Sequence, residues 1–160
     1  MTRTAVFVRE WEVARWQPTH DQEIPLNKPT ILVVDDTPAI LTIIKIYLER
    51  AGFSVMTAED SLQAWAVYTR YSSEIKLLLT DVDMPNVTGT EMADRVLRDN
   101  PDLPVLFMSG NAPSSDRGWG CLFKPFRHTE LLAKVRMALE PRSTMKSSGM
   151  PPEEPSELPR

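Results

Sequence analysis

Five polar side chains stand at the ends of four short apolar runs, and their types suit phosphoryl chemistry. They are Asp35 and Asp36 after TILVV (30–34), Asp81 at the end of KLLLTD (76–81), Ser109 at the end of VLFMS (105–109) and Lys124 after CLF (121–123). Three neighbouring carboxylates raise each other's pKa unless a cation joins them, and Mg²⁺ prefers such oxygen ligands. An ammonium and a hydroxyl beside them would stabilise a phosphoryl group, with Asp81 as its acceptor.

The surrounding elements predict how these residues come together. Apolar runs indicate strands at 30–34, 53–58, 76–81, 105–109 and 121–123, and apolar residues at helical spacing indicate helices at 38–52, 61–71, 88–100 and 127–139. Strands that alternate with helices through short connections predict a parallel α/β sheet with right-handed crossovers. Ligands bind beyond the carboxyl ends of such strands, so we expect the five polar residues to meet there.

Each of these residues also has an ordinary structural explanation. An acidic pair after a strand can be a helix N-cap beside a solvated charge, a serine that ends a strand is commonly a turn residue, and Lys-Pro often leads into a helix. What favours a site is the combination, because four separate strand ends carry the residue types that one chemistry needs.

Residues 30–139 resemble the receiver domain of two-component response regulators. The resemblance lies in the motifs ILVVDD, LLLTDVDMPNVTG (with Met84, Pro85 and Gly89), VLFMSG and FKPF. It implies a doubly wound, flavodoxin-like fold: a five-stranded parallel sheet of order 2-1-3-4-5 with helices on both faces. It also implies a signalling domain of a phosphorelay rather than an enzyme.

The resemblance assigns roles to the site residues. Asp81 would take a phosphoryl group from a sensor histidine kinase or a histidine phosphotransfer protein. Mg²⁺ would be bound directly by Asp36 and Asp81, with the backbone carbonyl of Asp83 as a further ligand and Asp35 acting mostly through water. Ser109 and Lys124 would hold the phosphoryl oxygens.

Two further residues occupy positions where receivers tune the lifetime of the phosphoryl group. They are Asp83, two residues after the acceptor, and Asn111, two residues after Ser109.

The chain departs from the family between the fourth and fifth strands. Ten residues, 110–119, remain there, including two Gly, one Pro and two Ser. A helix of ordinary length needs about 11 residues, and Gly and Pro disfavour it by about 1 and about 3 kcal/mol. We therefore expect the family's fourth helix to be missing or reduced to a loop.

A second departure concerns the aromatic residue that the family carries three positions before its lysine. That ring moves inward when the Ser/Thr hydroxyl shifts toward the phosphoryl group, but here the position holds Cys121. Trp119 is the candidate substitute. The ordinary explanation of Cys121 is a small buried apolar residue.

The rest of the chain is expected to flank one receiver domain at 29–140. Residues 1–28 form either a mobile tail or an arm whose Phe7, Trp11 and Trp16 cover the surface left by the missing helix, a surface that a second copy in a homodimer could cover instead. Residues 141–160 hold five of the 14 prolines and are expected to be disordered.

Composition limits the partners and the compartment. The net charge of −4 with scattered basic residues gives no reason to expect nucleic acid as a partner, and no apolar run approaches membrane-spanning length. One cysteine and the lack of a secretory signal fit the cytoplasm.

Three functions follow from these features. The first is a stand-alone receiver that acts on an unidentified downstream protein. The second is a phosphorylation-independent adaptor whose switch has decayed. The third is a phosphatase of the haloacid dehalogenase type, because the segment LLLTDVDMPNV also resembles the Asp-x-Asp motif of those enzymes. In those enzymes the acidic pair follows the nucleophile, whereas Asp35 and Asp36 precede Asp81, and the chain has no cap domain.

Overall fold

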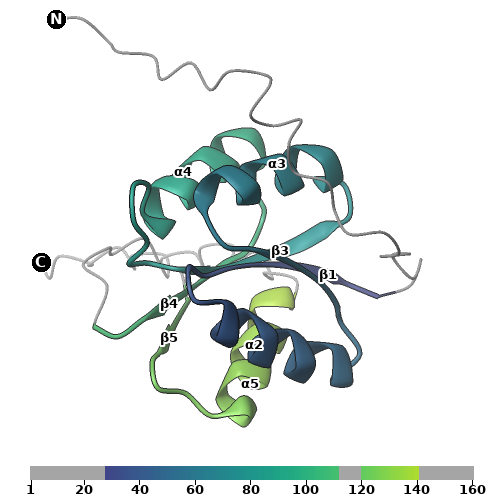
Figure 1. Cartoon of the computed structure of the whole chain (residues 1–160). Coiled ribbons are helices and arrows are strands. Elements are labelled where there is room, and N and C mark those ends of the chain that lie inside the picture. Colours follow the sequence, from purple (N-terminus) through teal and green to yellow (C-terminus); the bar gives the residue numbers. More distant parts are fainter. Residues whose placement is uncertain (1–27, 112–119, 141–160) are drawn as a thin grey trace, which may run out of the picture.

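The computed structural model describes residues 28–111 and 120–140 (Figure 1). Its centre is a five-stranded parallel sheet with the order β2-β1-β3-β4-β5. The strands are β1 (Thr30–Val34), β2 (Ser54–Ala58), β3 (Ile75–Asp81), β4 (Val105–Ser109) and β5 (Gly120–Phe123). This is the flavodoxin-like order, so the predicted fold class is confirmed.

Four helices in the described residues cover the two faces of the sheet. They are α2 (Pro38–Arg50), α3 (Ser61–Tyr71), α4 (Gly89–Asp99) and α5 (His128–Leu139). In Figure 1, α3 and α4 lie on one face, and α2 and α5 lie on the other. None of these helices is long and apolar enough to cross a membrane.

Local sequence signals account for where the helices begin and end. Pro38 occupies the first turn of α2, where its missing N–H costs no hydrogen bond, and Gly52 after that helix has φ +95°, a backbone conformation that favours glycine. Asp60 caps α3 by accepting a hydrogen bond from the N–H of Gln63 at 2.7 Å. The predicted capping box of Thr88 and Glu91 opens α4.

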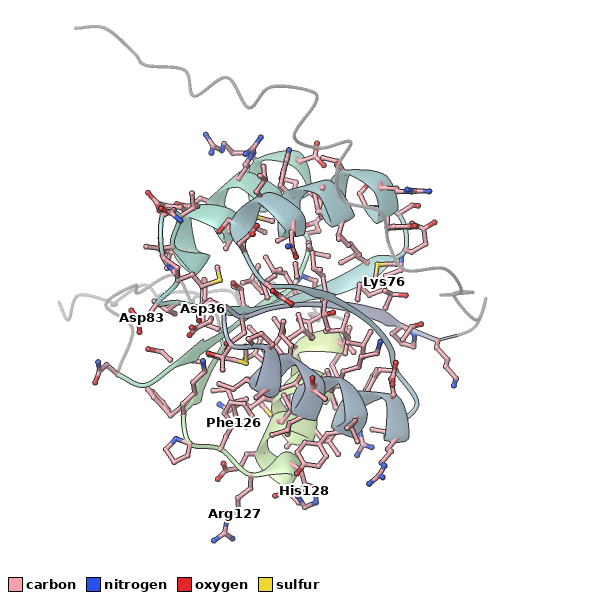
Figure 2. The ribbon with its side chains drawn as sticks, in the orientation of Figure 1. Asp36, Lys76, Asp83, Phe126, Arg127 and His128 are labelled. Atoms are coloured by element: carbon pink, nitrogen blue, oxygen red, sulfur yellow. The ribbon has the colours of Figure 1, made fainter. Side chains whose placement is uncertain are left out.

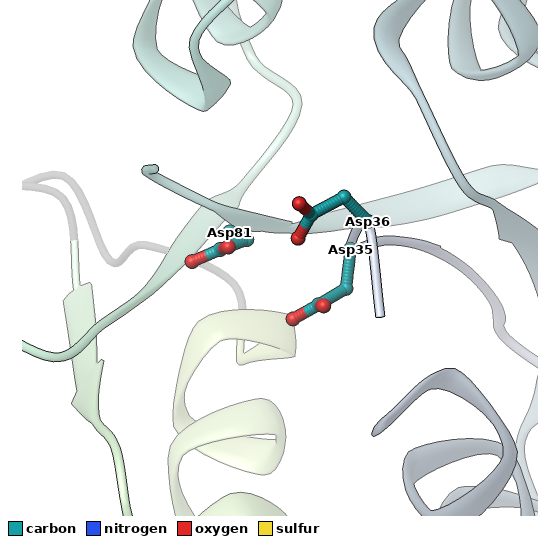
Figure 3. Close-up of side chains that lie close together, drawn as sticks. All are labelled: Asp35, Asp36 and Asp81. Carbon is teal, nitrogen blue, oxygen red and sulfur yellow. The ribbon is translucent and has the colours of Figure 1, made fainter. Parts of the chain in front are cut away.

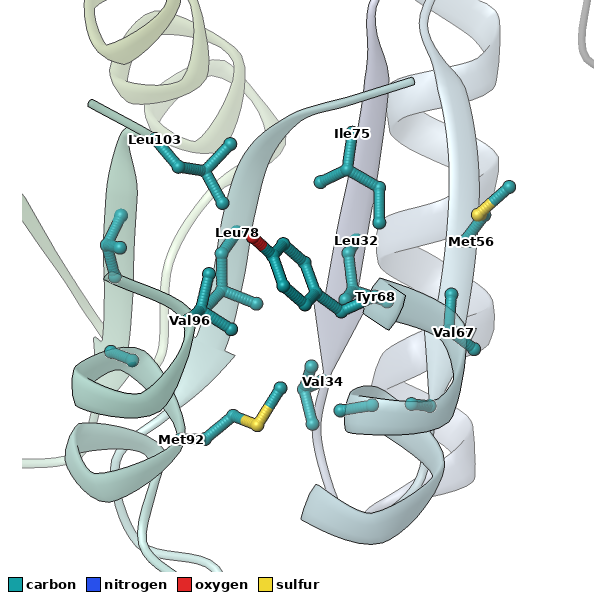
Figure 4. Packing of buried hydrophobic residues seen from close by; sticks show 14 of the residues in the cluster. Leu32, Val34, Met56, Val67, Tyr68, Ile75, Leu78, Met92, Val96 and Leu103 are labelled. Carbon is teal, nitrogen blue, oxygen red and sulfur yellow. The ribbon is translucent and has the colours of Figure 1, made fainter. Parts of the chain in front are cut away.

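Each face of the sheet has its own apolar core. The central strands β1 and β4 are buried along their whole length, as expected for strands covered on both faces. On the α3/α4 side, Figure 4 shows the ring of Tyr68 surrounded by aliphatic side chains. Its hydroxyl donates to Asp99 of α4 at 2.8 Å, and burial followed by that hydrogen bond raises the pKa of Tyr68 to about 12.

The connection between β4 and β5 is shorter than the other three crossovers. The other three crossovers run over 35–53, 59–74 and 82–104. Only the ten residues 110–119 join β4 to β5, although these strands also pair in parallel. Parallel strands usually need a dozen or more residues to cross over. The four described helices fit a receiver-like fold with a reduced helix, although 112–119, on which that prediction falls, lie outside the described residues.

Other predictions also fall outside the described part of the chain. The arm at 1–28 is described only at Lys28, and the segment 141–160 is not described. The same holds for Trp119, the candidate substitute for the family's aromatic residue.

Candidate functional site

The predicted carboxylates meet at the carboxyl edge of the sheet. Oxygen atoms of Asp35, Asp36 and Asp81 all lie within 4.8 Å of one another, and Figure 3 shows their side chains directed toward a common region. Figure 2 places Asp36 and Asp83 at this edge and Lys76, the second residue of β3, at the opposite one. The parallel topology brings the ends of β1 and β3 together because the two strands are hydrogen-bonded neighbours.

Lys124 supplies the positive charge of the site. Its Nζ donates to Oδ2 of Asp35 at 2.7 Å and lies 3.2 Å from Oδ1 of Asp81. The two aspartates are buried, with 0% and 5% of their surface exposed. A buried carboxylate is costly unless it is paired, so this ammonium allows both charges to remain at the end of the sheet.

The pKa values of Asp81 and Lys124 are both raised, for different reasons. Burial raises the pKa of Asp81; the charge and hydrogen bond of Lys124 oppose this increase without cancelling it, while the charge of Asp35 adds to it. Burial by itself would lower the pKa of Lys124. The hydrogen bond and charge of Asp35, followed by the charge of Asp81, outweigh it, so the pKa of Lys124 is raised.

The two members of the acidic pair have different surroundings. Both carboxylate oxygens of Asp35 are engaged, because Oδ1 accepts a hydrogen bond from the N–H of Thr37 at 2.9 Å and Oδ2 accepts from Lys124. Asp36 is exposed. Its carboxylate therefore faces solvent beside the buried carboxylate of Asp81.

The end of β4 brings the predicted hydroxyl to the same edge. Ser109 is 2% exposed and follows Met108, which pairs with Asp81 in the sheet. Its Oγ accepts a hydrogen bond from the N–H of Asn111 at 3.1 Å. Its carbonyl accepts from the N–H of Lys124 at 2.8 Å, so the ends of β4 and β5 are joined directly beside the site.

The loop after β3 and the start of α4 contact Asp81. The N–H of Asp83 donates to the Asp81 carboxylate, and the Asp83 side chain is exposed. Gly89, the first residue of α4, approaches so closely that a Cβ there would overlap the carbonyl oxygen of Asp81 and lie 2.8 Å from its carbonyl carbon. Sequence reasoning included Gly89 in a motif but did not identify this steric role, which depends on how α4 meets β3.

Cys121 lies on the α3/α4 side of β5, half-buried against that core. Burial raises the pKa of its thiol, and the charge of Lys134 opposes the rise. Phe123, two residues further on, was not singled out from the sequence, yet 53% of it is exposed. The alternation of side chains along β5 could have identified it, because it must share a face with Cys121.

The donor set fits Mg²⁺. This ion binds carboxylate oxygens at about 2.1 Å in octahedral geometry, so two ligands on opposite sides are about 4.2 Å apart. The three aspartates offer oxygens within 4.8 Å of one another, close to that spacing. Exposed Asp36 leaves room for the waters that Mg²⁺ usually keeps.

Known proteins share both the sequence and the fold. A model of the response regulator receiver domain family matches residues 31–136. The DNA-binding regulator RpaA of Synechocystis is 34% identical over 120 residues, covering 69% of this chain and 49% of that protein. Sensor protein EvgS of Escherichia coli O157:H7 is 34% identical over 122 residues, covering 71% of this chain and 10% of that protein. The structure of Vibrio cholerae chemotaxis protein CheY4 superposes with a TM-score of 0.65 at 26% identity, covering 70% of this chain and 99% of that chain.

The chain spans about half the length of RpaA and a much smaller part of EvgS, so the similarity to each is that of one region. That region contains the strands whose ends bear Asp35, Asp81, Ser109 and Lys124. The family match extends over more than half of the chain. The chain therefore belongs to the response regulator receiver domain family.

Proposed function

We propose that Asp81 accepts a phosphoryl group from a phosphohistidine in a Mg²⁺-dependent reaction, and that the chain signals by binding another protein. The observation that supports this most is the position of Lys124, whose ammonium lies 2.7 Å from Asp35 and 3.2 Å from Asp81. A positioned cation beside the acceptor stabilises the negative charge of an arriving phosphoryl group.

In the proposed transfer, an Asp81 carboxylate oxygen forms the new O–P bond while the N–P bond of phosphohistidine breaks. The electron pair of the N–P bond returns to the imidazole nitrogen. Lys124 would hold one phosphoryl oxygen, and the Ser109 hydroxyl would donate to another. Mg²⁺, when bound by Asp36, Asp81 and the Asp83 carbonyl, would neutralise further negative charge.

The proposed donor is a sensor histidine kinase or a histidine phosphotransfer protein. One relative with a matching segment, EvgS, is itself named a sensor protein, and RpaA is named a DNA-binding regulator. The family thus places such segments at different stages of signalling. For this chain, several expectations stay predictions. They are a cytoplasmic location, action as a stand-alone receiver without enzymatic activity, an unidentified downstream protein and a homodimer.

A second candidate function is the phosphorylation-independent adaptor. The observation that favours it is Cys121, which is half-buried against the α3/α4-side core at a position where the resemblance leads us to expect a mobile ring. In such an adaptor the acidic site would persist, but its state would not control the surface that binds another protein.

Intact-mass measurement separates these functions. We would incubate the full chain with Mg²⁺ and acetyl phosphate, beside an Asp81→Asn variant and a sample containing EDTA. Receiver chemistry predicts a gain of one phosphoryl group in the native chain alone. No gain in a sample that binds Mg²⁺, repeated with a phosphorylated histidine phosphotransfer protein as donor, would exclude Asp81 as an acceptor and favour the adaptor.

A further inference from the structure

Phe123 has an unusual position among the exposed apolar side chains of the described residues. The large ones are Ile43, Ile46, Leu62, Val87, Phe123 and Met137. Five of them lie on helices or in a loop, and Phe123 alone lies in a strand of the sheet. It ends β5, the strand at one edge of the sheet.

The ladder places Phe123 directly beside the site. In the register of β4 and β5, Phe123 is paired with Ser109, as Leu122 is with Met108 and Cys121 with Phe107. Leu122 and Met108 pack in the core on the α2/α5 side, whereas Cys121 and Phe107 pack on the α3/α4 side. Side chains alternate along strands, so Phe123 and Ser109 share the α3/α4 face, on neighbouring strands about 4.8 Å apart.

Two groups of the site are therefore immediate neighbours of one half-exposed ring. Ser109 lies across the ladder, and Lys124 is the next residue in the chain, with its N–H on the Ser109 carbonyl. Cys121 is less well placed to respond, because its ladder partner Phe107 is 1% exposed and lies two pairs further from the carboxyl ends of the strands.

Engaging a phosphoryl group must change both neighbours. The Ser109 hydroxyl would turn to donate to a phosphoryl oxygen, and the Lys124 ammonium would redirect part of its interaction from Asp35, which it now contacts at 2.7 Å. Most of the sheet's side chains are held in close-packed cores, whereas a ring that is 53% exposed can change rotamer at little cost.

We propose that Phe123 reports the occupancy of the Asp81 site at the surface: its ring changes position when Ser109 and Lys124 engage a phosphoryl group. This inference rests on the proposed function. It assigns the conformational response to a residue two ladder pairs nearer the site than Cys121.

Fluorine NMR tests the inference and the proposed function in the same spectrum. We would place 4-trifluoromethylphenylalanine at position 123 of the full chain and add Mg²⁺ with beryllium fluoride, a phosphoryl mimic that binds carboxylates. Bound fluoride gives its own resonances, which report occupancy independently of the label. We expect the label's resonance to shift in proportion to bound fluoride.

Two controls make the result specific. A label at Phe53, which precedes β2 at the opposite end of the sheet and packs on the α2/α5 side, should not shift. In a Ser109→Ala background that still binds fluoride, the shift at position 123 should be reduced or lost.

Three outcomes would overturn the inference. Bound fluoride with an unchanged resonance at position 123 would refute it while leaving the proposed function standing. An equal shift at Phe53 would show a global change instead of a local response. The absence of bound fluoride would refute the proposed function and this inference with it.

Discussion

Replacing Lys124 with methionine should leave two buried carboxylates facing each other without their cation. In the native chain, the Lys124 ammonium contacts Asp35 at 2.7 Å and Asp81 at 3.2 Å. Methionine keeps a similar apolar side-chain length and removes the charge. The substitution therefore isolates the electrostatic contribution of the ammonium to the free energy of unfolding.

The expected loss is about 3 kcal/mol at pH 7 without Mg²⁺. Breaking a buried ion pair by removing one partner typically costs about 3–5 kcal/mol, because a charge is left uncompensated. Protonating one aspartate instead would cost about 4 kcal/mol at pH 7, given an unperturbed pKa near 3.9. The lysine side chain is 23% exposed and Asp36 faces solvent, so water can enter and the lower end applies.

The loss should also depend on pH with a definite sign. In the variant, the pKa of Asp81, which burial already raises in the native chain, should rise further because Lys124 no longer opposes that effect. Stability therefore returns as the pH falls toward 4, because the folded protein takes up protons that remove the buried charge. Added Mg²⁺ should restore more stability to the variant than to the native chain, since a cation re-enters the acidic cluster.

Urea unfolding followed by circular dichroism measures these differences, with EDTA present in the first series. The matched control is Lys45→Met, because Lys45 pairs with Glu49 at 3.8 Å on the exposed surface of α2. Such a pair contributes about 0.5 kcal/mol or less. Equal unfolding midpoints for Lys124→Met and Lys45→Met would refute the claim that Lys124 balances two buried charges.

Three further predictions concern the site and the core behind it. Asp81→Asn should raise the urea midpoint at pH 7, because the raised pKa of Asp81 means that the fold favours its neutral form. This advantage should vanish as the pH falls below about 4, where the acid is protonated in both the folded and the unfolded chain. Gly89→Ala should destabilise the chain by about 3 kcal/mol in thermal unfolding, because its Cβ overlaps the Asp81 carbonyl, whereas Gly110→Ala, with nothing within 4 Å, should be close to neutral. Tyr68→Phe should cost about 1 kcal/mol by removing the hydrogen bond to Asp99. Since the pKa of Tyr68 is raised to about 12, native stability should also fall from pH 10 to 12 in a way that this variant lacks, as urea unfolding at each pH would show.

The strands and their polar ends were predictable because the signals are local. A five-residue apolar run such as 30–34 is typical of a strand buried on both faces, and the parallel connections then bring Asp35, Asp81 and Ser109 to one edge. Observed element bounds fall within two residues of the expected ones. The capping box at Thr88 was equally local, since it depends on residues three apart.

Other features of the site depend on contacts between distant parts of the chain. The shorter of the two contacts of Lys124 is with Asp35, a residue 89 positions away in the chain. The close approach of Gly89 to Asp81 reflects how α4 meets β3. The neighbour of Phe123 is set by the register of β4 and β5, and no pattern within either strand fixes that register.

The geometry of the acidic site therefore does not depend on the length of the connection at 110–119. The positions of Asp35, Asp81 and Lys124 follow from the ladder order and register of β1, β3, β4 and β5, which the ten-residue connection leaves in place. These positions do not depend on what covers the α3/α4 face of β5, where 53% of Phe123 is exposed. Phe123 pairs with Ser109 in the ladder and precedes Lys124 in the chain, so the acidic site and the exposed ring adjoin at one residue pair of β4 and β5.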